Sequence, residues 1–431
     1  MVATTSCYVL LVLGGLLLSS RAILDSLLRG VRLFQLHRST WGKYAVLNVP
    51  LIFVIVFIVS SGNKRNRDNP LVFLFTEHNN FLELQGETIT SPGNQNVAAR
   101  NGYPTYAGFE KKNVVLMICD ALRADHMSSY GYYRNTTPFL EALVSQGNAL
   151  QLTNFYATSS RPVLGISNIL SSQYSLSLGN FFIHDLLKKQ GYAINFILSG
   201  DHTNFYGLKD YYGGNVDMYA DGYSLRRSGS AVSVNDDALI STTLKELDDY
   251  DGTPAFFYLH FMSAHQAALV SQEHVAFEPH SRRQSAPALE MINSYDNGLI
   301  QLDRHIHNTI QVLEEKGFLD DALIVITADH GQSLKKMNQD LFWHNRTTFM
   351  SEIRIPLVIV DTANDLFDTI ELPLFANQLD IAPTLIQRLG LPVPGSWRGE
   401  SILHRSRQDI AFQQEGEFYS AIFSIDDVIL N

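Results

Sequence analysis

Two apolar segments of this sequence each end in side chains that can bind a metal ion. The run Leu323–Thr327 is followed closely by Asp329 and His330, and the run Asn113–Cys119 is followed by Asp120. Such runs are typical of strands buried in a parallel sheet, and ligands bind beyond the carboxyl ends of these strands. A carboxylate beside a histidine suits a metal such as zinc or manganese. Alone, Asp-His-Gly is more typical of a polar turn, but the second run with the same pattern favours one shared metal site.

The elements that position these residues alternate between strand and helix. Further strands are predicted over 192–198, 255–261 and 355–360, and helices over 138–146, 182–190, 236–250, 293–316 and 380–389. Strands that alternate with helices indicate βαβ units. We therefore predict an α/β fold with a mostly parallel sheet flanked by helices.

A third motif, Thr137-Pro138-Phe139-Leu140, follows the first apolar run. Together the motifs resemble the sulfatase-like branch of the alkaline phosphatase superfamily, over a stretch from about Asn113 to Leu403. Within it, the sequence is most similar to membrane-bound phosphoethanolamine and phosphoglycerol transferases, including lipoteichoic acid synthase-like sulfatase-domain proteins. The resemblance implies a divalent metal ion (zinc, manganese, calcium or magnesium). Its implied ligands are Asp120, Asp329 and His330.

By resemblance, His265 corresponds to a family histidine that contacts the substrate phosphate or sulfate or helps the leaving group, and His344 to a histidine that returns to the site. His265 lies shortly after the predicted strand 255–261. His344 lies in Phe342-Trp343-His344-Asn345, ahead of the predicted strand at 355–360. The resemblance implies that both bind substrate. His260 lies inside its strand and is predicted to be a buried core residue. Arg123 is predicted to be a surface residue or a support of the site.

The segment 156–171 should supply the nucleophile, and here the sequence departs from the family pattern. Relatives carry threonine, or a modified cysteine or serine, where the resemblance places Pro162, and proline has no nucleophilic atom. Proline is well accommodated in a first helical turn, so the fold would be preserved. Ser160, Ser159 or Thr158 is the candidate catalytic residue if the loop is shifted. Alternatively, a water activated by the metal attacks directly, and these hydroxyls only cap the helix.

The first 68 residues are predicted to be a membrane anchor with two transmembrane helices, within 3–20 and 44–61. Both apolar runs are near the lower length limit for crossing a bilayer. The connecting loop is rich in arginine, so the positive-inside rule places it in the cytoplasm and the C-terminal bulk outside it. Residues 69–112 are predicted to be a linker and 113–431 the sulfatase-like catalytic domain. The predicted location is therefore the cell (inner) membrane, with an extracytoplasmic catalytic domain.

Composition restricts the partners. The chain has a formal net charge of −11, and its anchor is basic, so the remaining residues are strongly acidic and have no general attraction for nucleic acid. The predicted partners are the membrane and a membrane lipid or phosphate or sulfate ester substrate. The predicted function is hydrolysis of such an ester, or transfer of a phospho-head-group from lipid to an envelope acceptor. The alternative is a catalytically inactive sulfatase-like protein that binds lipid or a partner, which Pro162 favours. A soluble cytosolic phosphatase is disfavoured by the two apolar runs.

Overall fold

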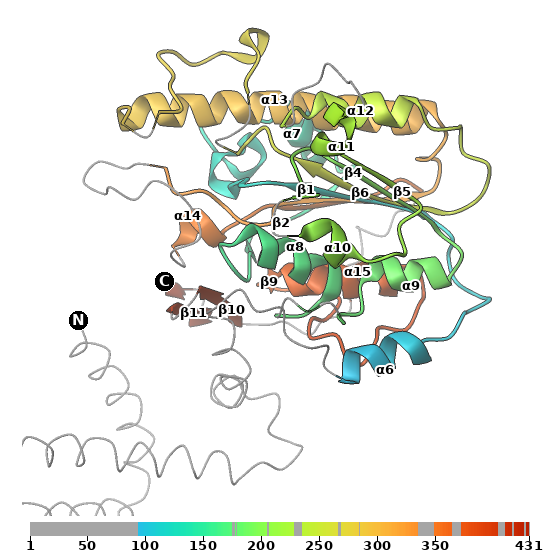
Figure 1. The fold of residues 1–431 in the computed structure, drawn as a ribbon. Coiled ribbons are helices and arrows are strands. Elements are labelled where there is room, and N and C mark those ends of the chain that lie inside the picture. Colours follow the sequence, from blue (N-terminus) through green and yellow to red (C-terminus); the bar gives the residue numbers. More distant parts are fainter. Residues whose placement is uncertain are drawn as a thin grey trace, which may run out of the picture. The chain divides into compact units, whose positions relative to one another are not determined.

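A seven-stranded sheet in the order β2-β8-β7-β1-β6-β4-β5 forms the middle layer of the protein, which is described here as a computed structural model (Figure 1). Its strands are β1 (Asn113–Cys119), β2 (Leu150–Leu152), β4 (Ala193–Leu198), β5 (Met218–Asp221), β6 (Ala255–Phe261), β7 (Ala322–Thr327) and β8 (Leu357–Asp361). Every residue of β1, β6 and β7 is buried, as expected for strands with helices on both faces.

The structure describes residues 94–403, except for 175–176, 178, 205–206, 228–234, 266–268, 284, 335–348 and 364–371, and three strands between 410 and 430. The two predicted transmembrane segments and His344 lie outside the described residues. None of the helices in the described ranges is both long and apolar enough to cross a membrane.

Strands β1 and β7, which carry the candidate acids, are parallel neighbours, with Val114 opposite Leu323. Strand β6 pairs with β1 on its other side, also in parallel. The three strands in the centre of the sheet therefore end at the same edge. This arrangement confirms the mostly parallel sheet that the alternation of elements predicts.

One strand departs from the parallel arrangement. Strand β8 runs antiparallel to both β7 and β2. Its apolar run identifies it as a buried strand, but an apolar pattern carries no information about strand direction. The chain between β7 and β8 contains no helix that crosses the length of the sheet among its described residues. Without such a crossover, β8 returns beside β7 in the opposite direction.

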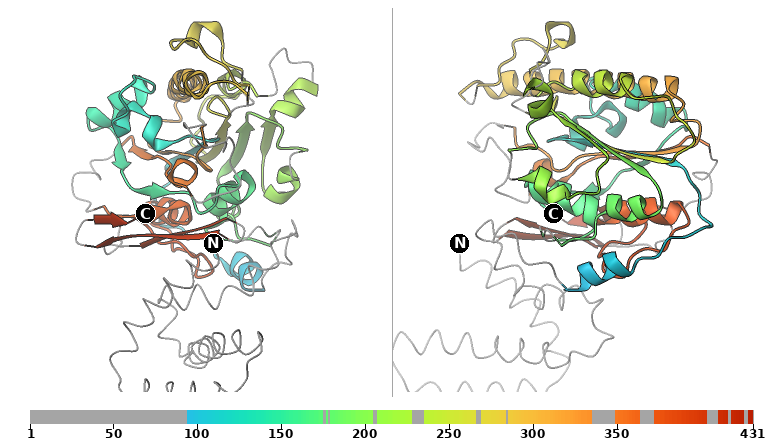
Figure 2. Two further views of the ribbon diagram at one scale, coloured as in Figure 1. Left: turned by 90° about the vertical axis from the view of Figure 1, so that its left-hand side faces the viewer. Right: turned by 45° about the vertical axis from the view of Figure 1, so that its right-hand side comes forward.

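Helices cover both faces of the sheet (Figures 1 and 2). One layer contains α7 (Pro138–Ser145), α12 (Ala238–Lys245) and α13 (Ala288–Glu315), and the other contains α8 (Pro162–Ser171), α9 (Ile183–Lys189) and α15 (Ile381–Arg388). Helix α13 begins earlier than predicted because its helical pattern continues back to Pro287, which precedes the first turn. Helix α12 ends earlier than predicted, before the acidic, glycine-containing segment 248–252.

Shorter elements complete the described fold. They are the helices α6 (Asn94–Gly102), α10 (Leu208–Tyr212), α11 (Gly222–Arg227) and α14 (Met350–Ile353), the 3-10 turns η3 (Ala124–His126), η4 (Ser128–Tyr130), η5 (Gln272–His274) and η7 (Gln378–Asp380), and the strands β3 (Phe155–Tyr156), β9 (Ala376–Asn377), β10 (Ile410–Glu415), β11 (Phe418–Ile425) and β12 (Val428–Leu430). Strands β3 and β9 pair in parallel, and β10, β11 and β12 form an antiparallel sheet.

The described part of the predicted linker packs against the domain. After α6, the Tyr103 hydroxyl donates a hydrogen bond to the Pro392 carbonyl at 2.7 Å. The Tyr106 amide donates to the side-chain oxygen of Gln190 at 2.8 Å. The Tyr103 side chain and the Tyr106 backbone thus contact the ends of α15 and α9, which joins residues 94–112 to the folded unit.

Candidate metal centre

Three side chains at the carboxyl edge of the sheet converge on one point. Asp120 follows β1, and Asp329 and His330 follow β7; all three are buried. One ligand atom from each lies within 4.8 Å of the other two. The Nε2 atom of His330 is 3.6 Å from Oδ1 of Asp120 and 3.6 Å from Oδ2 of Asp329. Because β1 and β7 are parallel neighbours, residues some two hundred positions apart in the chain meet here.

The hydrogen bonds around these groups leave three atoms directed at the same space. Oδ1 of Asp329 accepts hydrogen bonds from the amides of Ala121 (3.2 Å) and His330 (2.8 Å). Nδ1 of His330 lies 2.6 Å from the Gly331 carbonyl, so we assign its proton to Nδ1, which leaves the Nε2 lone pair for a ligand. Among the described residues, Oδ1 of Asp120 and Oδ2 of Asp329 are buried without a hydrogen-bond partner. Two carboxylate oxygens and one imidazole nitrogen form a donor set that fits a divalent cation.

Burial sets the ionisation of the cluster. It raises the pKa of Asp120 well above its usual value, and the nearby charge of Asp329 adds to this effect. It raises the pKa of Asp329 to about 6 and lowers that of His330 to about 3. Two acids are thus held close together in a buried place where ionisation is costly. A cation between them would compensate that cost.

Helix α8 packs directly on the end of β7. A Cβ atom at Gly165 would lie 2.2 Å from the carbonyl oxygen of Asp329, so only glycine allows this approach. Gln378 supports the same point from η7, because its Nε2 donates to the carbonyls of Ala328 (3.0 Å) and Asp329 (2.6 Å). The start of α8 and the candidate metal-binding acids therefore lie side by side.

The candidate nucleophiles lie in the loop that leads into α8. Thr158, Ser159 and Ser160 are all buried. The Thr158 hydroxyl donates to Oε1 of Gln378 at 3.0 Å and accepts from the side-chain amide of Asn168 at 2.6 Å. Oγ of Ser159 accepts from the Arg161 amide at 3.1 Å, within the turn that starts the helix.

Pro162 occupies the first turn of α8. Position 162 is three residues before Gly165, so both are on the helix face that meets Asp329. Position 162, where the family resemblance predicts a nucleophile, thus belongs to the face of α8 beside the candidate acids.

His265 lies beside the cluster. Its carbonyl accepts a hydrogen bond from Nη1 of Arg282 at 2.8 Å, and burial, aided by the charge of Arg282, lowers its pKa to about 4. A charge on His265 would lower the pKa of His330, so the two rings are within electrostatic reach. His260 is buried in β6 beside His202, with ring centres 4.5 Å apart, as predicted for a core residue.

Arg123, for which support of the site was one of two predicted roles, and Tyr295, which sequence analysis did not place at the site, both hold its loops. Arg123 is buried, not at the surface, and Nη1 donates to the Gln332 carbonyl at 2.9 Å. The Tyr295 hydroxyl donates to the Ala121 carbonyl at 2.8 Å and accepts from the Arg123 amide at 2.9 Å. These bonds stabilise Ala121 at a φ of 63°, which costs about 1–2 kcal/mol for a residue with a side chain.

Asp237 holds the loop that follows β6 by hydrogen bonds in a similar way. Its carboxylate accepts hydrogen bonds from the amides of Met262 (2.7 Å) and Ser263 (2.8 Å), just beyond the strand. In the sequence this acid has the pattern of a residue that stabilises a helix start. No signal in the sequence identifies a bond to a distant strand end.

Comparisons with known proteins identify the family and the fold of this chain. Residues 112–391 match the family model described as Sulfatase. The chain is similar to Kdo(2)-lipid A phosphoethanolamine 7''-transferase of Salmonella typhimurium, with 24% identity over 284 residues that cover 61% of this chain and 45% of the relative. It is also similar to phosphatidylethanolamine transferase Mcr-2 of Escherichia coli, with 23% identity over 316 residues that cover 65% of this chain and 58% of the relative.

Solved structures share the fold. The C-terminal periplasmic domain of EcEptC from Escherichia coli, in a complex with Zn, superimposes with a TM-score of 0.60 and 15% identity, covering 77% of this chain and 96% of that one. Lipoteichoic acid synthase LtaP from Listeria monocytogenes gives a TM-score of 0.57 and 17% identity, covering 78% of this chain and 92% of that one.

The fold and the position of the acids at the carboxyl edge define an alkaline-phosphatase-like α/β protein. The chain belongs to the sulfatase family, which confirms the predicted resemblance. Its relatives include phosphoethanolamine transferases. The chain spans about half the length of these curated relatives.

Proposed function

We propose that this protein catalyses metal-dependent transfer of a phospho-head-group from a membrane lipid to an envelope acceptor. The observation that carries the proposal is the cluster of Asp120, Asp329 and His330, with two buried carboxylate oxygens that lack partners among the described residues. Relatives whose names describe phosphoethanolamine transfer support the choice of a phosphoric ester. Hydrolysis of a phosphoric or sulfuric ester would need the same cation and the same nucleophile as head-group transfer. In hydrolysis, water takes the place of the envelope acceptor.

We propose the following roles for the residues of the site. Asp120, Asp329 and His330 would hold the cation, which would neutralise charge on the phosphoryl oxygens and lower the pKa of a nearby nucleophile. His265 is neutral at pH 7 because burial lowers its pKa to about 4, so it offers a hydrogen bond to the substrate. The hydroxyl of Ser160, or of Ser159 in its place, would attack the phosphorus in line with the leaving oxygen.

A second candidate function rests on Pro162. If no hydroxyl of the loop reaches the substrate, the protein binds a lipid or a partner through the same site without turnover. The first turn of α8 accommodates proline, so this function needs no change in the fold.

The deciding experiment measures metal content and turnover together. We expect the purified full chain to contain at least about one divalent ion per molecule and to release aryl alcohol from an aryl phosphodiester. A chelator should remove both the ion and the turnover. A protein that binds the ion and turns over neither aryl phosphodiesters nor aryl sulfates would support the binding function instead.

The proposed domain division makes a separate prediction about topology. Because residues 3–20 and 44–61 are proposed to span the membrane with a cytoplasmic loop between them, protease added outside intact cells should cleave after about residue 68. The cleavage would be detected with antibodies against an epitope in 113–431. Cleavage that requires permeabilised cells would reverse the proposed orientation.

A further inference from the structure

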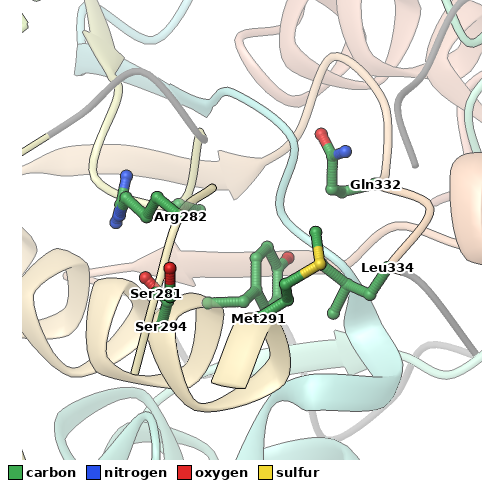
Figure 3. A pocket seen from close by; sticks show the side chains of 8 residues that line it. Ser281, Arg282, Met291, Ser294, Gln332 and Leu334 are labelled. Carbon is green, nitrogen blue, oxygen red and sulfur yellow. The ribbon is translucent and has the colours of Figure 1, made fainter. Parts of the chain in front are cut away.

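A pocket of about 310 Å³, continuous with open solvent, adjoins the metal centre on the side of α13 (Figure 3). Ala264, next to His265, and Gln332, two residues after His330, line it from the ends of β6 and β7. The remaining lining residues are Ser281, Arg282, Met291, Ser294, Tyr295 and Leu334. The pocket therefore opens at the edge of the sheet where the candidate acids lie.

The polar side chains of the pocket suit an anion. Arg282 is the charged member, and none of the eight described residues that line the pocket is acidic. Figure 3 shows Arg282 with Ser281 and Ser294 on one side of the pocket and Gln332 with Leu334 on the other, with Met291 between them. Ser294 is 3% exposed, and its hydroxyl is buried without a hydrogen-bond partner among the described residues. A buried hydroxyl with no partner is costly unless a ligand supplies one.

Arg282 is fixed in place. Nη1 donates to the carbonyl of His265 at 2.8 Å, which connects the pocket to the proposed substrate-binding histidine. A Cβ at Gly298 of α13 would come within 3.2 Å of Nη2, so glycine provides the space in which the guanidinium lies. Burial lowers the pKa of Arg282 to about 10, which still leaves the group charged at neutral pH.

We propose that this pocket binds a second anionic group of the substrate, a phosphate or sulfate next to the ester that reacts at the metal centre. The inference rests on the proposed function for the reacting ester, but the binding of the anion can be measured alone. Arg282 would pair with the anion, Ser294 would donate a hydrogen bond, and Met291 and Leu334 would contact the adjoining carbon chain. A substrate group that carries an ammonium would be repelled, because among the described lining residues it would meet a cation and no carboxylate.

The test measures binding of glycerol 3-phosphate to the detergent-solubilised full chain by calorimetry. It uses an Asp329→Asn background, so that binding at the metal centre does not contribute. Arg282→Gln should raise the dissociation constant about tenfold or more, since a hydrogen bond to a charged group contributes about 1.5–3 kcal/mol. Ser294→Ala should raise it about threefold to tenfold by the same reasoning, with less risk to the fold. Arg283→Gln is the matched control, because Arg283 is the exposed neighbour and its loss changes the net charge equally.

A second arm separates lipid from soluble ligands. If mixed micelles containing phosphatidic acid bind with the same dependence on Arg282, the anion is a lipid head-group; if only glycerol 3-phosphate does, it is a soluble phosphate. Both results support the pocket. The proposed anion site would be overturned if Arg282→Gln and Arg283→Gln changed the dissociation constant equally. It would also be overturned if neither Arg282→Gln nor Ser294→Ala changed it. Absence of ester turnover with Arg282-dependent binding intact would reject the proposed function and leave the anion site standing.

Discussion

Replacing Asp329 with asparagine is expected to remove the metal and to lower ester turnover about a thousandfold, because a metal ion stabilises a phosphoryl transition state by several kcal/mol. The substitution preserves shape. The amide oxygen of asparagine can accept the two backbone hydrogen bonds that Oδ1 accepts now. Its NH₂ group would replace Oδ2 and face Nε2 of His330, where a cation can no longer bind.

The same variant is expected to be more stable than wild type when both are free of metal. Burial raises the pKa of Asp329 to about 6, which means that folding favours its protonated form. Ionisation of this carboxyl group therefore costs stability, and the cost is present above pH 6 and disappears as the pH falls below the usual aspartate value. The asparagine side chain carries no charge, so the thermal midpoint of the Asp329→Asn variant at pH 7.5 should rise by about 2–5 °C. Adding zinc or manganese should raise the midpoint of wild type and leave that of the variant unchanged.

Asp303→Asn is the matched control for this experiment. Asp303 is also buried, and burial raises its pKa to about 6, but its carboxylate accepts hydrogen bonds from the Phe139 and Leu140 amides at the start of α7. Its replacement should leave the metal content at the wild-type value. Metal content is measured by elemental analysis and stability by scanning calorimetry. An Asp329→Asn protein that retains a full equivalent of metal would show that the ion binds elsewhere.

Much of the candidate metal centre could be predicted because the pattern that locates its residues is local and periodic. An unbroken apolar run predicts a strand covered on both faces, and the first polar residues after it must lie at the edge of the sheet. Asp120 and Asp329 could thus be located from two short segments. Their convergence needed one further fact, the parallel pairing of β1 with β7, which the alternation of helices and strands suggests.

The supporting residues could not be predicted in this way because their partners are distant in the sequence. For Arg123 the sequence left a surface position and a supporting role open, and only the bonds to the Gln332 carbonyl and to Asp125 decide for the supporting role. Gln378 precedes a helix whose sequence pattern indicates only packing, yet it connects the Thr158 loop to the end of β7. A single polar residue has no periodic pattern. Its neighbours in the sequence predict the helix, strand or turn in which it lies, but not the distant residue that it contacts.

Removing the hydroxyl of Ser160 is expected to abolish turnover while metal content stays unchanged. The family resemblance predicts a nucleophile at the position of Pro162, and Ser160 is the candidate hydroxyl nearest to that position in the sequence. Ser160→Ala should lower turnover at least about a thousandfold, as loss of a covalent nucleophile does in other enzymes. Thr158→Ala is the control, because that hydroxyl joins Gln378 to Asn168. Its loss should lower the thermal midpoint more than the rate.

The Pro162→Thr variant tests the opposite possibility, that this chain has lost its nucleophile. Threonine at the first turn would restore a hydroxyl on the face of α8 that meets Asp329, and a first-turn threonine costs little helix stability. If Ser160 is the nucleophile, the variant should change single-turnover release of an aryl alcohol by no more than about threefold, because chemistry already proceeds through another hydroxyl. An inert wild type that gains at least tenfold turnover in Pro162→Thr would instead identify a lapsed enzyme with an intact metal centre. In that case Ser160→Ala, combined with Pro162→Thr, would leave the restored turnover in place, since the new hydroxyl and not Ser160 would attack the phosphorus.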